Sequence, residues 1–363
     1  MRIIQVLPTI AFGDAVGNDT IAIKKALQEF GYDTAIYAEV IDQRLPEGTA
    51  IQLNEYELPP VEKDDICIYH MSTGSLLNYT FEYMNCHKVL VYHNVTPPAF
   101  FAPYSKDITR NAKSGVDGIK HLADKVEFCF ADSEYNKKDL ISYGFTCPIV
   151  VRPILIPFED YKKEPSQELI DKYSNDGYKN FIFVGRVAPN KKHEDIISGF
   201  AYYKKHFNEK SRLFLVGAGG AFFKYEKRLN DYVKELGLED SVIFTGHLKF
   251  NEILAYYRIA DAFLCMSEHE GFCVPLTESM FFNVPIIAYN STAIPYTLKD
   301  SGVVIDDKDP VVVAEAMNKV VTDEAFRNEV VEKQKERLKD FSYDTIKSLL
   351  KKQLDSYIDS IKG

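Results

Sequence analysis

The stretch Ala262–Met280, AFLCMSEHEGFCVPLTESM, joins an apolar run to a polar segment and then to a proline. Ala262–Met266 has the uninterrupted apolar pattern of a strand buried on both faces of a parallel sheet. Pro275 is tolerated only in the first turn of a helix, so a helix is expected to begin about there. The segment between them, Ser267–Gly271, is therefore predicted to be a loop that leaves the carboxyl end of a strand and enters a helix.

Similar short apolar runs alternate with helical patterns along the whole chain, which predicts parallel β-α-β units. In the first half, strands are expected at Arg2–Leu7, Thr34–Tyr37, Asp65–Tyr69, Lys88–Tyr92, Glu127–Phe130 and Pro148–Val151. In the second half, further strands are expected at Asn180–Val184, Arg212–Val216, Ser241–Thr245 and Val284–Ala288. The sequence thus predicts an α/β protein with two Rossmann-like, doubly wound domains.

A polar segment, Ile156–Lys179, separates the two sets of strands and contains Pro157 and Pro165. It reads as a linker followed by the first element of the second domain. We therefore expect an N-terminal domain over residues 1–157 and a C-terminal domain over residues 158–342. The periodic segment Tyr343–Ile361 predicts a final helix with no strand after it.

Composition narrows the class of protein. The formal net charge of -10 argues against a general nucleic-acid binder and gives no support for strong attraction to anionic lipid. The N-terminal apolar run meets Pro8 too soon for a signal peptide, and no segment approaches the length of a membrane span. The six cysteines form no CxxC pair, so reduced core thiols in a cytoplasmic protein are expected.

Ligands of doubly wound sheets bind beyond the carboxyl ends of the strands, so residues just after strands are the candidates for a site. After the first strand, Gly13 and Gly17 flank Asp14, ahead of a helix expected to begin at Thr20 with a cap at 18 or 19. Such a loop suits a diphosphate, although a turn that simply needs glycine is the favoured interpretation here.

Two histidines end neighbouring expected strands of the first domain. His93 enters the proline-bearing loop HNVTPP, and its position favours a functional role. His70 is followed by MSTGS, and its position leaves a functional and a structural role equally open.

In the second domain, two cations follow the first strand. Arg186 and Lys191 lie in GRVAPNKK, where they form an anion clamp or a solvated basic loop. Gly217 begins GAGG after the next strand, and Gly246 would let a planar base approach the backbone.

The opening stretch contributes two carboxylates to the same candidate site. Glu270 is expected on the loop and Glu278 in the first turn of the helix or just past it, where its alternative role is a partner of the helix dipole. The backbone N–H groups near Phe272–Val274 and Leu276–Thr277 are expected to be unpaired and available to a ligand.

Taken in order, GRVAPNKK, LVGAGG, VIFTGHL and SEHEGFCVPLTE resemble the retaining glycosyltransferases of family 4, which have the GT-B fold. The two glutamates of the last motif are separated by seven residues. The motifs NVPIIAY and SGVVIDDKDPVVVAEAM follow, so the resemblance covers roughly residues 180–320. It implies two domains that face each other across a cleft, with the final helix, 343–363, packed back on the N-terminal domain.

The resemblance also implies the roles of individual residues. Arg186 and Lys191 would bind the donor diphosphate without a metal or other cofactor, and His93 would lie close to the sugar and the acceptor. Glu270 would bind hydroxyls of the transferred sugar, and Glu278 those of the ribose. The donor site would further include Gly17, Gly185, Gly217, Gly246, Leu248, Phe272, Cys273, Val274, Leu276 and Thr277, with Asp14 and His70 on the acceptor side.

The sequence departs from the family pattern at two loop positions. Lys192 stands where the family usually has glycine, and Cys273 replaces the second glycine of EGFG. The first loop also lacks the common double glycine. Asp307-Lys-Asp309 has the DxD form of a metal motif but lies in a late loop remote from the donor, and we reject it as a metal site.

The resulting expectation is a retaining hexosyltransferase that uses a nucleotide-diphosphate sugar in cell-surface polysaccharide or glycoconjugate synthesis. The base pocket around Gly246–Leu248 offers no acidic residue for a guanine edge, which favours a UDP-sugar and leaves a GDP-sugar open. The acceptor is expected to be a glycan, a lipid-linked glycan or a small molecule, and association with the inner face of a membrane stays open. The alternatives are a GT-B epimerase or phosphorylase, or a non-catalytic subunit that binds sugar nucleotides.

Overall fold

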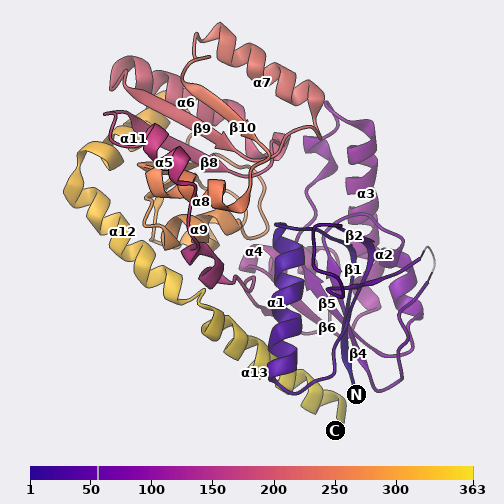
Figure 1. Ribbon diagram of the computed structural model, residues 1–363. Helices are drawn as coiled ribbons and strands as arrows, with labels where there is room; N and C mark the ends of the chain where they lie inside the picture. The colour runs from indigo at the N-terminus through magenta and orange to yellow at the C-terminus, as the bar shows by residue number, and fades with distance from the viewer. Residues whose placement is uncertain (55–56, 363) are drawn as a thin grey trace. The chain divides into compact units, whose positions relative to one another are not determined.

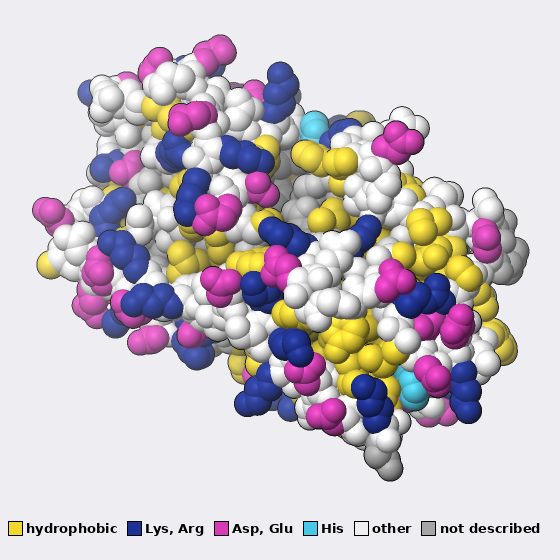
Figure 2. Space-filling model, turned by 60° about the horizontal axis from the view of Figure 1, so that its bottom comes forward, with side chains coloured by type: hydrophobic (Ala, Val, Ile, Leu, Met, Phe, Trp, Pro, Cys, Tyr) yellow, Lys and Arg dark blue, Asp and Glu magenta, His cyan; other side chains and the backbone are white. Residues whose placement is uncertain are grey.

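The computed structural model describes residues 1–54 and 57–362 and divides into two compact units. Unit 1 comprises residues 1–102, 106–157 and 341–363, and unit 2 comprises residues 103–105 and 158–340. Each unit contains one parallel sheet covered by helices (Figure 1). Basic and acidic side chains are interspersed over the face displayed in Figure 2.

Unit 1 contains a seven-stranded parallel sheet in the order β3-β2-β1-β4-β5-β6-β7. Its strands are β1 (Ile3–Ile10), β2 (Ile36–Ile41), β3 (Ile51–Gln52), β4 (Ile66–Met71), β5 (His87–Tyr92), β6 (Phe128–Ala131) and β7 (Ile149–Val151). Its helices are α1 (Ala15–Glu29), α2 (Leu77–Thr80), α3 (Lys106–His121), α4 (Glu134–Ser142) and α13 (Tyr343–Lys362). All six strands expected in this half are present within a few residues, and β3 was not expected.

Alternation along the strands divides the core of unit 1 between the two faces of the sheet. In β4, Cys67 and Tyr69 face a cluster that includes residues of α2, α3 and α4. Ile66 and Ile68 face the other side, where α1 and α13 cover the sheet. Figure 1 shows α13 beside α1, so the end of the chain completes the core of the first unit.

The first helix begins earlier than the sequence analysis predicted. It starts at Ala15, and the carboxylate of Asp14 caps it by accepting hydrogen bonds from Val16 and Gly17. Asp19 is wholly buried inside the helix instead of capping it. The prediction of a cap at 18 or 19 is therefore wrong, because Asp14 already satisfies the first free N–H groups.

Unit 2 contains a six-stranded parallel sheet in the order β10-β9-β8-β11-β12-β13. Its strands are β8 (Lys179–Val184), β9 (Ser211–Val216), β10 (Val242–Gly246), β11 (Ala262–Cys265), β12 (Ile286–Tyr289) and β13 (Val303–Ile305). Its helices are α5 (Gln167–Tyr173), α6 (His193–His206), α7 (Phe223–Glu235), α8 (Phe250–Ile259), α9 (Val274–Phe281), α10 (Ile294–Leu298), α11 (Pro310–Thr322) and α12 (Glu324–Lys339). Every strand expected here is present, and β13 is an additional edge strand.

The long opening stretch adopts the predicted conformation. β11 ends at Cys265, and α9 begins at Val274, with Pro275 in its first turn. β11 lies in the middle of the sheet, between β8 and β12, so the loop after it leaves from the centre of the carboxyl edge. Among the residues that the structure describes, no helix is long and apolar enough to cross a bilayer.

Candidate active site

Three glycines follow one another across the carboxyl edge of the second sheet, at the ends of β8, β9 and β10. The N–H of Gly185 donates to the carbonyl of Val216, and Gly217 forms an isolated bridge with Gly246. A Cβ added at Gly217 would lie 2.1 Å from the carbonyl oxygen of Gly185. Glycine is therefore required at this position by the close approach of two backbones.

The loop that follows β8 carries three cations, and the two that were expected to bind a ligand, Arg186 and Lys191, have different environments. The exposed side chain of Arg186 makes no hydrogen bond or ion pair with another described residue. Lys191, in contrast, donates from Nζ to both carboxylate oxygens of Glu270, each at 2.6 Å. Burial favours the neutral amine, but the adjacent Glu270 outweighs it and raises the pKa of Lys191. Of these two candidate cations, Arg186 therefore has no described partner and Lys191 is paired with Glu270.

The loop after β11 is held from both sides by hydrogen bonds. The side chain of Asn190 donates to the carbonyl of His269, and the N–H of Glu268 donates to the carbonyl of Asn190. The N–H of Glu270 donates to Thr292, and Thr297 donates to the carbonyl of Phe272. These contacts fix Glu270, which is only 7% exposed, beside the loop that carries Lys191.

The two departures from the family pattern have the same backbone conformation. Lys192 has φ 52° and Cys273 has φ 70°, and they precede α6 and α9 directly. This left-handed region favours glycine, the residue that the resemblance leads us to expect at both positions. The side chains of Lys192 and Cys273 are therefore held at some cost in backbone strain.

The backbone at the start of α9 is less available than predicted. The N–H of Leu276 donates to the carbonyl of Cys273, so the prediction that it is unpaired was wrong: a first-turn hydrogen bond already uses it. The side chains of Leu276 and Thr277 are buried, while that of Val274 is half-buried. In the expected pocket for the nucleotide base, Leu248 is also half-buried.

Glu278 lies four residues into α9, and two phenols donate to its carboxylate. Tyr161 donates to Oε1 at 2.6 Å and Tyr257 to Oε2 at 2.5 Å. Burial raises the pKa of Glu278, and the two hydrogen bonds oppose that shift. The sequence analysis did not identify either tyrosine, because they lie 117 and 21 residues from Glu278 along the chain.

Glu268 belongs to an ion-pair network. Its carboxylate contacts Lys308 and lies 3.2 Å from Lys192, and Lys308 also pairs with Asp195 at 2.6 Å. In the same late loop, the side chain of Asp309 caps α11. In the DxD segment, Lys308 thus forms ion pairs and Asp309 caps a helix.

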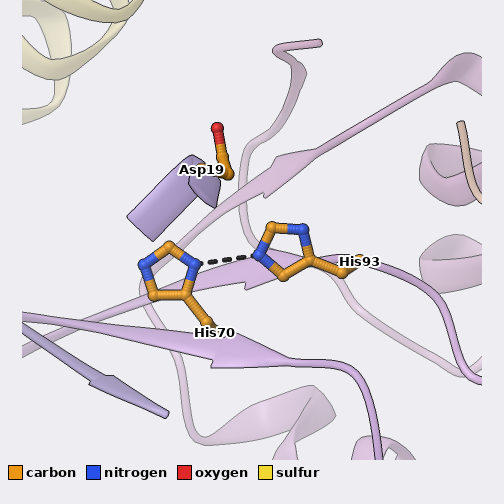
Figure 3. Close-up of side chains that lie close together, drawn as sticks. All are labelled: Asp19, His70 and His93. Carbon is orange, nitrogen blue, oxygen red and sulfur yellow. Dashed lines mark hydrogen bonds between the residues drawn. The ribbon is translucent and has the colours of Figure 1, made fainter. Parts of the chain in front are cut away.

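In unit 1, His70 and His93 come together as expected for neighbouring strands. Nδ1 of His70 lies 2.9 Å from Nε2 of His93, and Figure 3 shows the two rings with Asp19 beside them. Nε2 of His70 contacts the amide oxygen of Gln5 at 2.9 Å, and Nδ1 of His93 contacts Asp132 at 2.8 Å. Both ring nitrogens of each histidine are therefore used inside the unit.

The hydrogen-bond partners determine the protonation of this pair. The amide nitrogen of Gln5 donates to the carbonyl of Thr20, so its oxygen accepts, and His70 must donate from Nε2. Nδ1 of His70 then accepts from Nε2 of His93, and the charged form of His93 donates its other N–H to Asp132. Burial opposes that charge, but Asp132 outweighs it and raises the pKa of His93, whereas burial and His93 lower the pKa of His70.

A buried ion pair lies beside the histidines and was not foreseen from the sequence. Arg152 donates to both oxygens of Asp19, at 3.0 and 2.7 Å, and the N–H of Leu155 donates to Oδ1 at 2.7 Å. Neither side chain is exposed. Asp19, His70 and His93 form a group of potential metal ligands, but both ring nitrogens of each histidine already have partners within the unit, and Arg152 is paired with Asp19.

Gly17 and Asp14 have structural roles in the first loop. A Cβ added at Gly17 would lie 2.8 Å from the carbonyl oxygen of Ala11, so packing within α1 and its loop requires glycine there. Asp14 caps α1, as described above. These contacts favour the interpretation of this loop as a turn that needs glycine.

The second unit is similar to a known family of domains. Residues 166–337 match the family model described as "Glycosyl transferases group 1". The chain is 27% identical over 197 residues to alpha-monoglucosyldiacylglycerol synthase from Streptococcus pneumoniae, an alignment that covers 54% of this chain and 42% of that protein. Alignments with eight such relatives span between 20 and 58% of the relatives' own lengths.

Solved structures match along the whole chain. Sucrose-phosphate synthase from Thermosynechococcus elongatus gives a TM-score of 0.77 at 14% identity, over 99% of this chain and 100% of that one. Anabaena Alr3699/HepE in complex with UDP-glucose gives a TM-score of 0.76 at 15% identity, over 98% of this chain and 100% of that one. These likenesses show that the chain has the α/β GT-B fold.

Proposed function

We propose that the protein is a retaining glycosyltransferase that transfers a hexosyl group from a nucleotide-diphosphate sugar. The observation that carries this proposal is the ion pair between Lys191 and Glu270 at the carboxyl edge of the second sheet. The cation that we assign to the diphosphate and the carboxylate that we assign to the sugar lie on adjoining loops, in the segment that matches the group 1 glycosyltransferases.

In this proposal Arg186 and Lys191 bind the diphosphate and stabilise the negative charge of the departing nucleotide. Arg186 is exposed, and its guanidinium can make bidentate contacts with phosphate oxygens. Lys191 remains charged because Glu270 raises its pKa. These two cations supply the electrostatic stabilisation of the transition state, and no metal is needed for that step.

The two glutamates orient the two halves of the donor. Glu270 accepts hydrogen bonds from hydroxyls of the transferred sugar, and Glu278 accepts them from the ribose. Each carboxylate oxygen has a second lone pair, so the existing contacts with Lys191, Tyr161 and Tyr257 leave room for ligand hydroxyls. Backbone contacts from Gly185, Gly217, Gly246, Phe272 and Cys273 complete the donor site.

Retention is proposed to proceed by front-face attack. The bond between the anomeric carbon and the phosphate oxygen breaks as the acceptor hydroxyl adds to the same face, and the leaving phosphate takes the hydroxyl proton. Glu270 orients the sugar and forms no glycosyl ester. His93, whose ring nitrogens both bond within unit 1, is assigned to positioning the loop that it begins.

We infer a UDP-sugar as donor, because the base pocket at Gly246–Leu248 contains mainly backbone groups. The solved HepE complex with UDP-glucose agrees with this inference, while the printed name of another relative specifies GDP-mannose. The acceptor is inferred to be a glycan or a lipid-linked molecule of cell-surface polysaccharide or glycolipid synthesis. Relatives named for a diacylglycerol and an undecaprenol-linked acceptor support that class, and with it a place at the inner face of a membrane.

The test is a thermal-shift panel of UDP-, GDP- and ADP-sugars, followed by transfer assays with the stabilising donor. Arg186→Ala and Glu270→Ala should each abolish most of the transfer, and product NMR should show the donor's anomeric configuration. Wild-type rates in either variant would contradict the assignment. An altered sugar nucleotide without acceptor would indicate an epimerase, and tight binding without turnover a non-catalytic subunit.

A further inference from the structure

Two thiols and a carboxylate converge in the loop after β11. Cys265 is the last residue of β11, Glu270 lies in the loop, and Cys273 caps α9. Their sulfur and carboxylate oxygen atoms all lie within 4.8 Å of one another. The three residues are 0%, 7% and 8% exposed, so this is an enclosed cluster and not a set of surface groups.

The backbone conformation gives no reason for a cysteine at position 273. Cys273 has φ 70° and ψ 70°, a conformation in which a side chain typically costs about 1 kcal/mol or more relative to glycine. Glycine would suit this cap better, so any advantage of cysteine must come from its side chain. That side chain is directed toward Cys265 and Glu270.

We propose that Cys265, Glu270 and Cys273 form a binding site for a thiophilic divalent cation, with Zn²⁺ as the biological ligand. Tetrahedral zinc, with Zn–S near 2.3 Å and Zn–O near 2.1 Å, places its ligand atoms about 3.5–3.8 Å apart. The cluster reaches that spacing with side-chain shifts of about 1 Å or less. Two thiolates and one carboxylate leave a fourth position for water.

The charges of the occupied site balance. Each thiol releases its proton to solvent when it binds the metal, so two thiolates offset the charge of the cation. Lys191 continues to offset Glu270, as it does now at 2.6 Å. The buried loop therefore gains no net charge on metal binding, which removes the main electrostatic penalty for a cation in an enclosed site.

The consequence for activity rests on the proposed function. A metal that binds Glu270 uses the carboxylate oxygens that would otherwise accept hydrogen bonds from the sugar hydroxyls. It also occupies the space beside the backbone amides near Cys273. Metal and donor should then compete, so the site is inhibitory and distinct from metal-assisted catalysis. Zn²⁺ would lower transfer, and saturating donor would protect the enzyme.

Metal binding itself is tested without any donor. The reduced full-length chain is titrated with CdCl₂, and cadmium–thiolate absorption is followed in the ultraviolet. Cys273→Gly is the main variant, because glycine suits the positive φ and should preserve the fold. It should weaken cadmium binding by more than about 100-fold, since even outer partners of metal ligands often contribute about 10–100-fold. Glu270→Gln should weaken it as well.

A second thiol pair provides a matched control. The sulfurs of Cys129 and Cys147 in unit 1 lie 3.5 Å apart, and no His, Asp or Glu ligand joins them among the described residues. The double variant Cys129→Ala/Cys147→Ala should bind cadmium as the wild type does. Unchanged affinity in Cys273→Gly, or loss of binding in the Cys129/Cys147 variant alone, would overturn the proposal. Neither result depends on glycosyl transfer.

Discussion

Lys191 and Glu270, 79 residues apart in the sequence, form a bidentate ion pair in which Nζ lies 2.6 Å from each carboxylate oxygen. Glu270 is 7% exposed and Lys191 is half-buried, so the pair is only partly screened by solvent. Parallel strands β8 and β11 are neighbours in the sheet, and their loops leave the same edge. Adjacent strands thus bring the two charges together.

Removing the cation should affect chemistry more than binding. Lys191→Gln is expected to lower kcat about 10²–10³-fold, as the loss of one group that stabilises transition-state charge typically does. Steady-state kinetics with the stabilising donor measure this. Lys191→Arg, which keeps the charge, should recover part of the rate, and equal rates in the Arg and Gln variants would argue against an electrostatic role.

Removing the phenols should weaken nucleotide binding. Tyr257→Phe and Tyr161→Phe each delete a hydrogen bond to the carboxylate of Glu278, whose orientation would then be less fixed. We expect the nucleotide Kd to rise about 5–10-fold per variant, less than the full value of about 1.5–3 kcal/mol for a charged hydrogen bond. Calorimetry with the free nucleotide checks this. Tyr83→Phe, at a phenol that is 74% exposed, is the control and should bind normally.

The histidine pair predicts a pH dependence of stability. The pKa of His93 is raised in the folded protein, so its contribution is fully present below the unfolded value of about 6.5 and is lost as pH rises through the folded pKa. The stability difference between wild type and His93→Asn should shrink over that range. In NMR titrations Asp132→Asn should lower the pKa of His93, and an unchanged value would contradict the pairing.

The ion pair inside unit 1 should contribute strongly when only one partner is removed. Arg152→Met leaves Asp19 buried without its cation, which should destabilise the unit by about 3–5 kcal/mol. Urea unfolding measures the change. Arg44→Ala removes a surface partner of Asp42, and a loss of about 1 kcal/mol or less is expected there.

The glycines at the carboxyl edge should differ in their tolerance of a side chain. Gly217→Ala places a Cβ 2.1 Å from a backbone oxygen, whereas a Cβ at Gly246 meets no atom within 4 Å. Both residues have positive φ, so Gly246→Ala should cost about 1 kcal/mol from backbone strain alone. Gly217→Ala should cost about 1–3 kcal/mol more, because the sheet edge must open. Thermal unfolding of the two variants gives the comparison.

Much of the fold could be predicted because the strands carry a strong local signal. Apolar runs such as those at Asn180–Val184 and Ala262–Cys265 are strands in the structure, and Pro275 marks the first turn of α9. The short edge strands β3 and β13 carry weaker signals and were missed. The start of α1 was misplaced because several polar residues in a row could serve as its cap, and only the backbone selects Asp14.

In the candidate site, too, some features could be predicted from the sequence and others could not. Its residues could be named from the order of the motifs and from their positions after strands. The hydrogen-bond partners of those residues could not be predicted. Tyr161 and Tyr257 reach Glu278 only because the folded chain brings distant segments together, and no local pattern indicates such contacts. The same holds for Asp132 and Arg152, which set the charge of His93 and Asp19.

The sequence by itself determined the two sets of parallel strands, the loops that follow them and the residue types placed on those loops. These features depend on local periodicity and on the backbone limits of proline and glycine. Only the tertiary structure decided which charges form ion pairs, which carboxylates accept hydrogen bonds from tyrosines and which thiols lie close together. Such contacts join distant segments, and their energies depend on burial, which exists only once the chain has folded.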